Sequence, residues 1–534
     1  TSHRIPFVPA SEAKPPKMGT SIPIIDRMPQ GFTDLNEMED DKAFSSNLYT
    51  DTAVYGNWVS NAKRSSSKNN GSFYEQNLRY DLYATKKTGD SLAFSMDTTT
   101  TNDPREYKEG FTLNQFAVES RTPKSMLVFG HSYPEFSDYT VTQQVMGLYG
   151  VQRFEDTEIR SFAGYKAVEK DDLKNPRRVG GVRMEHRHDE AVTIGLNAVS
   201  TKDVRDNPGS DKDLPTLQNR VYSMDVQIKP TENLYVNGEY AGSNTDFDMR
   251  DEFGHQSGSA FRAMGGYSRE NFQFEAGVEE GGSAFLTPLS ESLRDERAFL
   301  TKFFYELNRY ISARLAWRGS RDNLGDFKRA TLVRDQPEAQ ITMHPSDYYR
   351  DLRFDLYYQP LHEYSDNGKY LDRYRTLGWL ELNHRAGSFH YFAGLTSTID
   401  KDKITPLNDR DIGKLDFKLT WDFDAFRQVY SSYSTEQLSY RNAGGGDRTS
   451  ITGFGGRSRF HEDLSLALDY IYEANDLKTA LSDSRHYRLN FSLTKEFNNL
   501  SRFIFDVEGS DNRFDAKARD FSDVTAKLRF IKSF

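Results

Sequence analysis

The sequence has no cysteine among its 534 residues. That absence excludes disulfides, thiolate metal sites and covalent c-type haem attachment, which requires a C-x-x-C-H motif. No apolar run approaches the ~18 residues that a membrane-spanning helix needs, and the mean hydropathy is -0.75. The 69 basic and 79 acidic residues are interspersed, so no basic stripe is available to nucleic acid. We therefore expect a protein that binds no nucleic acid and carries no covalently attached haem.

The chain is instead rich in aromatic residues and glycine. Aromatic residues make up 13% of the sequence, with 37 Phe and 30 Tyr but 4 Trp, and Gly occurs 37 times. Low hydropathy combined with abundant Tyr and Phe is typical of strands that show half their side chains to an apolar medium and half to water. The composition therefore favours a chain of half-apolar strands.

Apolar and polar residues alternate with a period of two along most of the chain. In LRFDLYY (352–358), Phe354 and Leu356 lie on one side of a strand, and Arg353 and Asp355 lie on the other. The same alternation recurs in residues 221–228, 414–421, 464–472 and 487–494. It predicts a sheet with one apolar face and one wet face.

The connections between these strands alternate between long and short. Counting back from the C-terminus, residues 511–519 are a long connection and 496–499 a short one, followed by 473–483 (long) and 460–463 (short). We count about 26 strands, an even number. Short turns at one edge and long loops at the other are typical of an outer-membrane barrel with periplasmic turns, and an even count places both termini in the periplasm. A soluble sandwich or propeller requires no such alternation, and no blade-length repeat recurs. The predicted fold is an all-β, transmembrane, antiparallel up-and-down barrel.

The beginning of the chain differs in composition from the rest. We predict a Pro-rich arm over residues 1–45, periplasmic or lumenal, and a transmembrane barrel over residues 46–534. Proline has no amide donor and is excluded from central strands, so the arm is expected to be extended or irregular. It is either a disordered tail or a segment that docks in a lumen or on a partner. The prolines concerned are Pro6, Pro9, Pro15, Pro16, Pro23 and Pro29.

The last strand carries a candidate assembly signal. Leu528, Phe530 and Phe534 lie on one side of residues 524–534, and Lys532 interrupts that apolar face. The pattern resembles the closing strand of Gram-negative outer-membrane β-barrel proteins, a porin-like superfamily whose assembly machinery reads a C-terminal signal ending in Phe. The resemblance implies an outer-membrane location, with lipid and the assembly machinery as partners.

The predicted barrel is wide. Barrel diameter grows with strand number, and transporters with ~22 strands already need a plugged lumen. The arm is too short to be the folded plug of a TonB-dependent receptor. A barrel of this size with a short N-terminal segment and no plug resembles the barrel component of porin–cytochrome electron conduits.

This second resemblance implies a sheath that holds a periplasmic multihaem cytochrome across the outer membrane for extracellular electron transfer, often with another cytochrome at the outer surface. Haem c then belongs to the partner, and this chain binds no cofactor itself. The best-known branch carries a C-x-x-C near its mature N-terminus, which this chain lacks. The main alternative is a diffusion channel or exporter for a polar solute or polysaccharide, with its lumen constricted by loops such as 201–218, 243–258 and 281–297.

Strand parity selects candidate lumen-facing residues. A polar inner wall would keep charged cargo away from hydrocarbon, where an unpaired charge is very costly. The candidates carry both signs, which suits a wall packed against protein better than a pore selective for ions of one sign. They are Asp225, Gln227, Arg353, Asp355, Asp416, Lys418, Asp469, Arg488, Asn490, Lys527 and Arg529.

No catalytic, cofactor-binding or metal-binding residue is predicted, and the chain is expected not to be an enzyme. His186 and His188 in EHRHDE (185–190) share a strand face, and two such His are able to bind a metal. The turn pattern predicts a solvated short hairpin there instead. GGGDR (444–448) precedes a strand rather than a helix, so it offers no helix N-terminus to a phosphate.

Two further segments carry structural expectations. LSESLRDER (289–297) is predicted to form one or two helical turns with Ser290 as the cap. The long loop that contains it, 283–299, is expected to fold inward or to meet a partner outside. Aromatic residues near strand ends are predicted to form interfacial girdles. The examples are Tyr470, Tyr472, Phe304 and Tyr305.

Overall fold

The computed structural model describes the chain from residue 42 onward, with short gaps. The described residues are 42–60, 70–103, 110–166, 177–189, 191–204, 216–249, 254–290, 294–326, 328–345, 351–442, 444–461, 463–477, 483–498, 501–515 and 520–533. Most of the predicted arm, residues 1–41, therefore lies outside the described residues. The first strand begins at Lys42 rather than at residue 46, because its partner strand continues to Lys86 and pairs with residues 42–45 in register.

The described residues form 26 strands in one sheet and one short 3-10 helix, η3 (Pro406–Asn408). No helix among these residues has the length and apolar composition that crossing a membrane requires. The strands are β1 (Lys42–Val59), β2 (Gly71–Lys86), β3 (Ser91–Thr101), β4 (Phe111–Arg121), β5 (Ser125–Ser132), β6 (Val145–Phe154), β7 (Thr157–Lys166), β8 (Arg177–His188), β9 (Val192–Asp203), β10 (Gln218–Thr231), β11 (Leu234–Asp246), β12 (His255–Arg269), β13 (Phe272–Gly281), β14 (Glu296–Asn308), β15 (Ile311–Asp322), β16 (Leu332–Met343), β17 (Arg353–Ser365), β18 (Asp372–Ala386), β19 (Phe389–Asp402), β20 (Arg410–Asp422), β21 (Arg427–Tyr440), β22 (Gly446–His461), β23 (Leu464–Asp476), β24 (Ser484–Asn498), β25 (Ser501–Phe514) and β26 (Phe521–Ser533).

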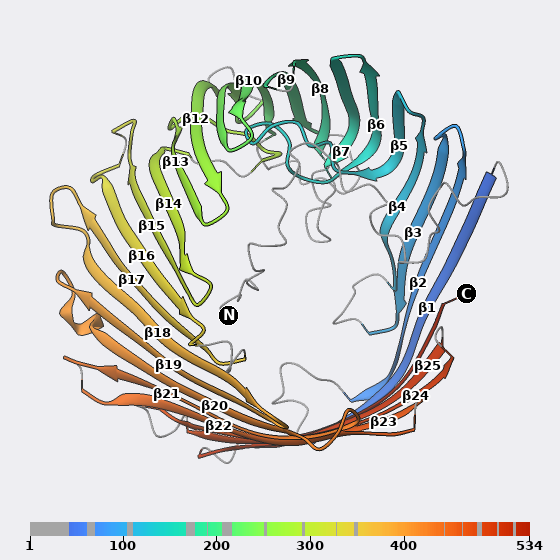
Figure 1. Cartoon of the computed structure of the whole chain (residues 1–534), viewed down its shortest axis with the longest axis vertical. Helices are drawn as coiled ribbons and strands as arrows, with labels where there is room; N and C mark the ends of the chain where they lie inside the picture. The colour runs from blue at the N-terminus through green and yellow to red at the C-terminus, as the bar shows by residue number, and fades with distance from the viewer. Residues whose placement is uncertain are drawn as a thin grey trace.

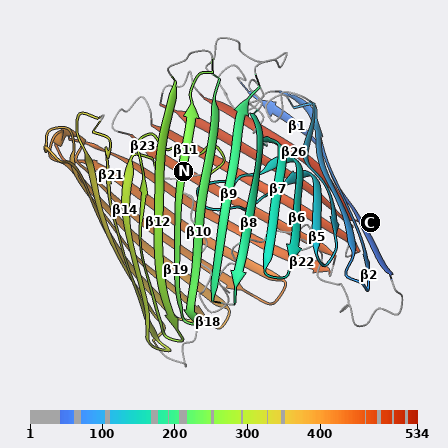
Figure 2. The same ribbon diagram turned by 90° about the horizontal axis from the view of Figure 1, so that it is seen from above.

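The sheet closes on itself. Each strand pairs antiparallel with the next one in the chain, and β26 returns to pair with β1, from Tyr49 opposite Ser533 to Val59 opposite Asp523. Figure 1 looks into the resulting ring, and Figure 2 shows the oblique crossing of the near and far walls that strand tilt produces. Closure removes every sheet edge. The predicted up-and-down barrel and its strand number are confirmed.

The outer face of the barrel is apolar. Leu489 in β24 is 50% exposed and Leu528 in β26 is 46% exposed, whereas their chain neighbours Arg488 and Lys527 lie on the opposite face. An apolar belt that runs around a protein is unfavourable in water and is what the core of a bilayer requires. The fold is therefore a transmembrane β-barrel. Of the predicted assembly signal, Leu528 and Phe530 share this outer face, and Phe534 lies outside the described residues.

The connections alternate between the two edges as predicted, with one departure. Turns such as 87–90 and 155–156 lie at the short-turn edge, and 133–144 and 282–295 lie at the long-connection edge. The connection from β16 to β17, residues 344–352, is long although it lies at the short-turn edge. The regular alternation still sets the up-and-down order of the strands.

One predicted girdle residue lies on the other face. Phe304 is opposite Gln273 and Arg314 on the inner face, whereas Phe303 and Tyr305 lie outward with ring centroids 6.4 Å apart. The sequence reads FFYE at this point, and three consecutive aromatic residues leave the phase of a strand ambiguous by one position.

Candidate functional site on the inner wall

The inner face can be followed from strand to strand. Ser223 of β10 shares a hydrogen bond with Ser137, a residue of a loop inside the ring, at 3.1 Å. Directly opposed residues of an antiparallel pair lie on the same face, so the face of Asp225 continues through Glu239 to Arg262. The same register places all the predicted lumen-facing residues on the inner face: Asp225, Gln227, Arg353, Asp355, Asp416, Lys418, Asp469, Arg488, Asn490, Lys527 and Arg529.

Asp225 belongs to a buried network centred on Arg183 of β8. The Arg183 guanidinium donates to Asp225 Oδ2 at 2.6 Å and to Glu185 Oε2 at 3.1 Å. It also donates to Asn197 Oδ1 at 2.9 Å, and Asn197 Nδ2 donates to Asp225 at 2.8 Å. Each charge in this low-dielectric region is thus met by an opposite charge or an amide dipole, as burial requires.

Other candidates are paired with a neighbour on the same strand or the next one. Arg353 donates to Asp355 at 2.6 and 2.8 Å, and Asp355 is only 3% exposed. Arg529 donates to Asp51 across the β26–β1 seam, with Nε at 2.7 Å. The charges of these pairs are therefore balanced within the wall itself.

Aromatic and amide side chains complete the wall on β20–β24. Tyr430 donates its hydroxyl to Asp469 at 2.6 Å, and the Lys418 ammonium lies over the Tyr430 ring, 5.1 Å from its centroid. Lys414 forms an ion pair with Asp416 at 2.9 Å. Mixed charges in short-range pairs leave this surface polar without a dominant sign.

Two more candidates are less tightly held. Arg488 is 4.0 Å from Glu508, and both side chains are about half exposed. The buried carbonyl oxygen of Asn490 has no hydrogen-bond partner among the described residues. Gln227 lies on the same face, opposite Asn237 and Thr193.

The β5–β6 connection, residues 133–144, folds into the lumen. Figure 1 shows it inside the ring, next to β7 and β8. Phe136 packs edge-on against Phe162 of β7 with centroids 5.2 Å apart, and Val141 is fully buried in the same cluster. Tyr139 reaches across to β12 and donates its hydroxyl to the Phe261 carbonyl at 2.9 Å.

The β13–β14 connection, residues 282–295, folds inward beside the first loop. Phe285 and Leu289 are fully buried. The Phe285 ring meets Tyr139 at a centroid distance of 5.6 Å, and Thr142 N donates to the Leu289 carbonyl at 2.9 Å. Of the two orientations predicted for this loop, the inward one is correct.

The predicted helical turns of 289–297 do not form in the described part of the segment. Residues 294–295 are a bend, and β14 already begins at Glu296. Ser290 donates its hydroxyl to the Asp138 carbonyl of the other loop. Residues 291–293, where the predicted first turn would begin, lie outside the described residues. Of the predicted loop 201–218, residues 205–215 lie outside the described residues. Of 243–258, both ends belong to β11 and β12, which leaves a connection of 247–254, and residues 250–253 lie outside the described residues.

Close backbone approach at Gly258 of β12 lets the second loop dock. A Cβ atom at this position would lie 2.2 Å from Phe285 N and 2.6 Å from Phe285 Cα. Separations this short do not occur between real atoms. A side chain at position 258 would therefore push the loop off the wall.

The docked loops also shift the acidity of one of their own groups. Burial raises the pKa of the Glu135 carboxyl above its usual range, and the charge of Arg160 opposes that shift. Arg160 also donates to the Glu135 carbonyl at 2.8 Å. The ionised form of the Glu135 carboxyl is thus less stable in the docked loop than it would be in water.

The sequence predictions did not identify 133–144. The sequence feature that indicates an inward-folded loop is the set of apolar residues Phe136, Tyr139 and Val141, which interrupt an otherwise polar connection. An extended loop on the outer surface has no reason to carry them, because they would be exposed there.

His186 and His188 lie at the end of β8, outside the lumen, and a hairpin turn at 189–191 follows them as predicted. His186 shares a hydrogen bond with Thr157 at 3.0 Å, and the His188 side chain is 76% exposed. Within the described ranges, no group of three or more His, Asp or Glu side chains is arranged to hold a metal.

Two sectors of the inner wall differ in what covers them. The covered sector is the wall of β6–β13, beneath the loops 133–144 and 282–295. The bare sector is the wall of β15–β26, where Ile531 is the one buried apolar side chain among the described residues of these strands.

No protein-family model and no curated protein matches the chain. Distant similarity to solved structures is found. One is the translocation pore of the P pilus usher PapC, at 10% identity and a TM-score of 0.38, covering 92% of this chain and 99% of that one. Another is the siderophore receptor PirA from Pseudomonas aeruginosa, at 10% identity and 0.41, covering 91% and 80%. A third is OccAB4 from Acinetobacter baumannii, at 9% identity and 0.29, covering 94% and 100%. TM-scores this low carry no weight for function, so the proposals below rest on the residues of this chain.

Proposed function

We propose that this chain is an outer-membrane barrel of a Gram-negative bacterium that surrounds a protein partner in its lumen. The partner we propose is a periplasmic multihaem cytochrome, so that the barrel acts as an insulating sheath for electron transfer across the membrane. The bare sector carries this proposal, because it is a broad polar wall that no described segment of the chain covers. In this proposal, the short turns and both termini face the periplasm.

The lumen has room for a folded domain. With strands ~4.8 Å apart and tilted by ~40°, a circular ring of this strand number is on the order of 50 Å across its backbone. A compact domain of ~100 residues has a radius of gyration of only about 13 Å. The sheath therefore accommodates such a domain even with the two infolded loops in place.

The charge pattern of the bare sector supports a protein occupant. Its acids and bases are paired within the wall, as in Arg353 with Asp355 and Lys414 with Asp416. Such a surface neither repels nor concentrates ions of one sign, and it offers polar groups for hydrogen bonds with a partner. It also separates haem propionates from hydrocarbon, where their charge would be very costly.

The absence of cysteine allows a direct test. Ser432 of β21 lies on the inner face opposite Lys418, and the adjacent Ser431 lies outward opposite Leu419. Ser432→Cys is labelled with a photoactivatable benzophenone maleimide in native membranes and irradiated, and products are stained for haem. We expect a haem-positive adduct of this chain, and none from the matched Ser431→Cys, which faces lipid.

A labelled Ser432→Cys barrel without a haem-positive adduct, and a colourless barrel on gentle detergent purification, would exclude the sheath. The second candidate is then a diffusion channel or exporter for a polar solute or polysaccharide. The infolded loops favour it, because they narrow the lumen. It predicts steady conductance of the purified barrel in planar bilayers.

A further inference from the structure

Basic side chains gather on the outer face of β8–β10 at the long-connection edge. Arg178 of β8 is directly opposite Lys202 of β9. Arg220 of β10 is opposite Ser200, one row further from the edge. All three basic side chains are exposed. We call them the rim cations.

The rim cations have no acidic partner among the described residues. No ion pair involves Arg178, Lys202 or Arg220 within the part of the chain that the structure describes. An acid, Asp246 of β11, lies two strands away in the same cross-strand row as Lys202. Its carboxylate is 3.8 Å from His255. Like charges directly opposite each other destabilise a strand pair, so the site favours an anion from outside the chain.

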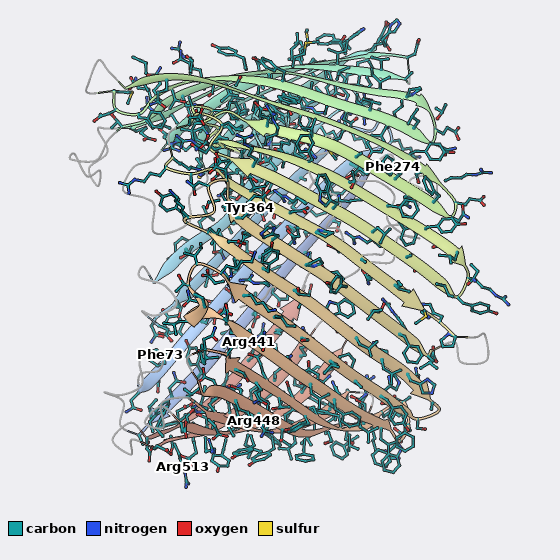
Figure 3. The ribbon with its side chains drawn as sticks, turned by 90° about the vertical axis from the view of Figure 1, so that its left-hand side faces the viewer. Phe73, Phe274, Tyr364, Arg441, Arg448 and Arg513 are labelled. Carbon is teal, nitrogen blue, oxygen red and sulfur yellow. The ribbon has the colours of Figure 1, made fainter. Side chains whose placement is uncertain are left out.

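Elsewhere on the same rim, an equivalent pair of cations is neutralised. Arg485 of β24 is directly opposite Arg513 of β25. Arg485 is 2.5 Å from Asp476, and Arg513 is 2.8 Å from Asp511. Figure 3 labels Arg513 along this edge of the barrel. Among the described residues, the two basic pairs therefore differ in whether an acid neutralises them.

An apolar surface lies directly next to the rim cations. Tyr165 is opposite Arg178 and 44% exposed. Further along the same face, Val182, Leu196 and Tyr222 are 46%, 44% and 57% exposed. Cations above an exposed apolar and aromatic surface lie at the depth of lipid headgroups in a membrane barrel.

We propose that the rim cations bind the phosphate groups of an anionic glycolipid in the leaflet on the long-connection side. The guanidinium groups of Arg178 and Arg220 would hold phosphate oxygens through paired hydrogen bonds, and Lys202 would add a point charge. The acyl chains would lie along Val182 and Tyr222. This site rests on the proposed outer-membrane location and does not depend on what occupies the lumen.

The test measures lipid binding by the purified barrel. Native mass spectrometry in a non-ionic detergent follows titration with bis-phosphorylated lipid A and, separately, with inorganic phosphate. The triple variant Arg178→Gln, Lys202→Gln, Arg220→Gln is expected to bind lipid A about 10²-fold more weakly, since each basic group near an anionic surface contributes roughly a factor of five. The matched control Arg485→Gln, Arg513→Gln is expected to change binding by less than about twofold, because those cations are already neutralised.

Equal affinity of the wild type and the triple variant for lipid A would overturn the site, as would equal weakening by the control. Inorganic phosphate bound as tightly as lipid A would show a free-phosphate site and overturn the lipid assignment. Should the triple variant fail to assemble, Lys202→Gln alone is expected to weaken lipid A binding by about fivefold. Absence of a haem partner leaves these outcomes unchanged, so this proposal and the sheath fail separately.

Discussion

The covered and bare sectors are built alike, from antiparallel strands with alternating side chains, but the side chains on their inner faces make different contacts. In the covered sector, the loops bring Phe136, Phe285 and Leu289 onto the wall and bury them. In the bare sector, inner side chains balance one another in ion pairs, and no described segment of the chain covers them. Within the described residues, the chain thus covers its own wall in one sector and does not cover it in the other.

The difference has a physical consequence for stability and for function. The covered sector is stabilised by the burial of apolar side chains away from water. The bare sector depends on polar pairs that water weakens. We therefore expect substitutions to be costly in the covered sector and tolerated in the bare one, where the partner contact is proposed.

The largest effect is expected from Gly258→Val. The new side chain overlaps Phe285 and displaces the loop 282–295, which removes the burial of Phe285 and Leu289, worth roughly 5 kcal/mol. Trypsin is then expected to cut rapidly after Arg294, as followed by electrophoresis of the folded barrel. Gly413→Val is the control, because no atom lies within 4 Å of a Cβ at that position. Equal cleavage of both variants would show that the loop is not held by this contact.

The next effect compares one arginine from each sector. Arg183→Leu leaves Asp225 without its cation, whereas Glu185 keeps Arg187 at 3.1 Å. We expect a loss of about 3 kcal/mol in the free energy of unfolding. Arg488→Leu removes an exposed partner 4.0 Å from Glu508, and we expect a loss below about 1 kcal/mol. Denaturant unfolding in detergent, followed by the electrophoretic shift of the folded barrel, measures both. Similar losses would erase the distinction between the sectors.

A smaller effect is expected from Tyr139→Phe. The ring keeps its contact with Phe285, and the variant loses only the hydrogen bonds of the hydroxyl, to the Phe261 carbonyl at 2.9 Å and to Glu279 at 3.4 Å. We expect docking of the loop 133–144 to weaken by about 1 kcal/mol, seen as faster hydrogen exchange in that loop. Tyr139→Ala removes the ring as well and is expected to have the greater effect. A Tyr139→Phe variant as mobile as Tyr139→Ala would assign the docking to the hydroxyl rather than to packing.

The smallest effect is a pH dependence of the same loop. The pKa of Glu135 is raised by burial in the docked loop, so docking is strongest below the usual Glu value of ~4.3 and weakens as pH rises from there through the raised pKa. Papain cleavage of the loop is expected to be slower near pH 4 than near pH 7, after correction for the enzyme's own activity. Glu135→Gln is expected to lose this dependence. Faster cleavage of the wild-type loop at low pH would contradict the assigned sign.

Much of the barrel was predictable because its information is local. Alternation such as that of 352–358 assigns each side chain to a face, and the loop lengths assign each strand a direction. The candidate wall residues from Asp225 to Arg529 follow from that parity. Phe304 was assigned to the wrong face because, among three consecutive aromatic residues, the alternation does not show which side chains point inward. The loop 133–144 was missed because its few apolar residues have no period to detect.

The sequence by itself determined the number of strands, their up-and-down order and the face that each side chain takes, because period and loop length act over a few residues. The tertiary structure alone decided which loops enter the lumen and which basic side chains form ion pairs with acidic ones. Phe285 meets Gly258, and Arg183 meets Asp225, only after the ring brings distant segments together. Those contacts depend on how side chains from distant segments fit together and on their charges. The spacing of residues along one strand predicts neither.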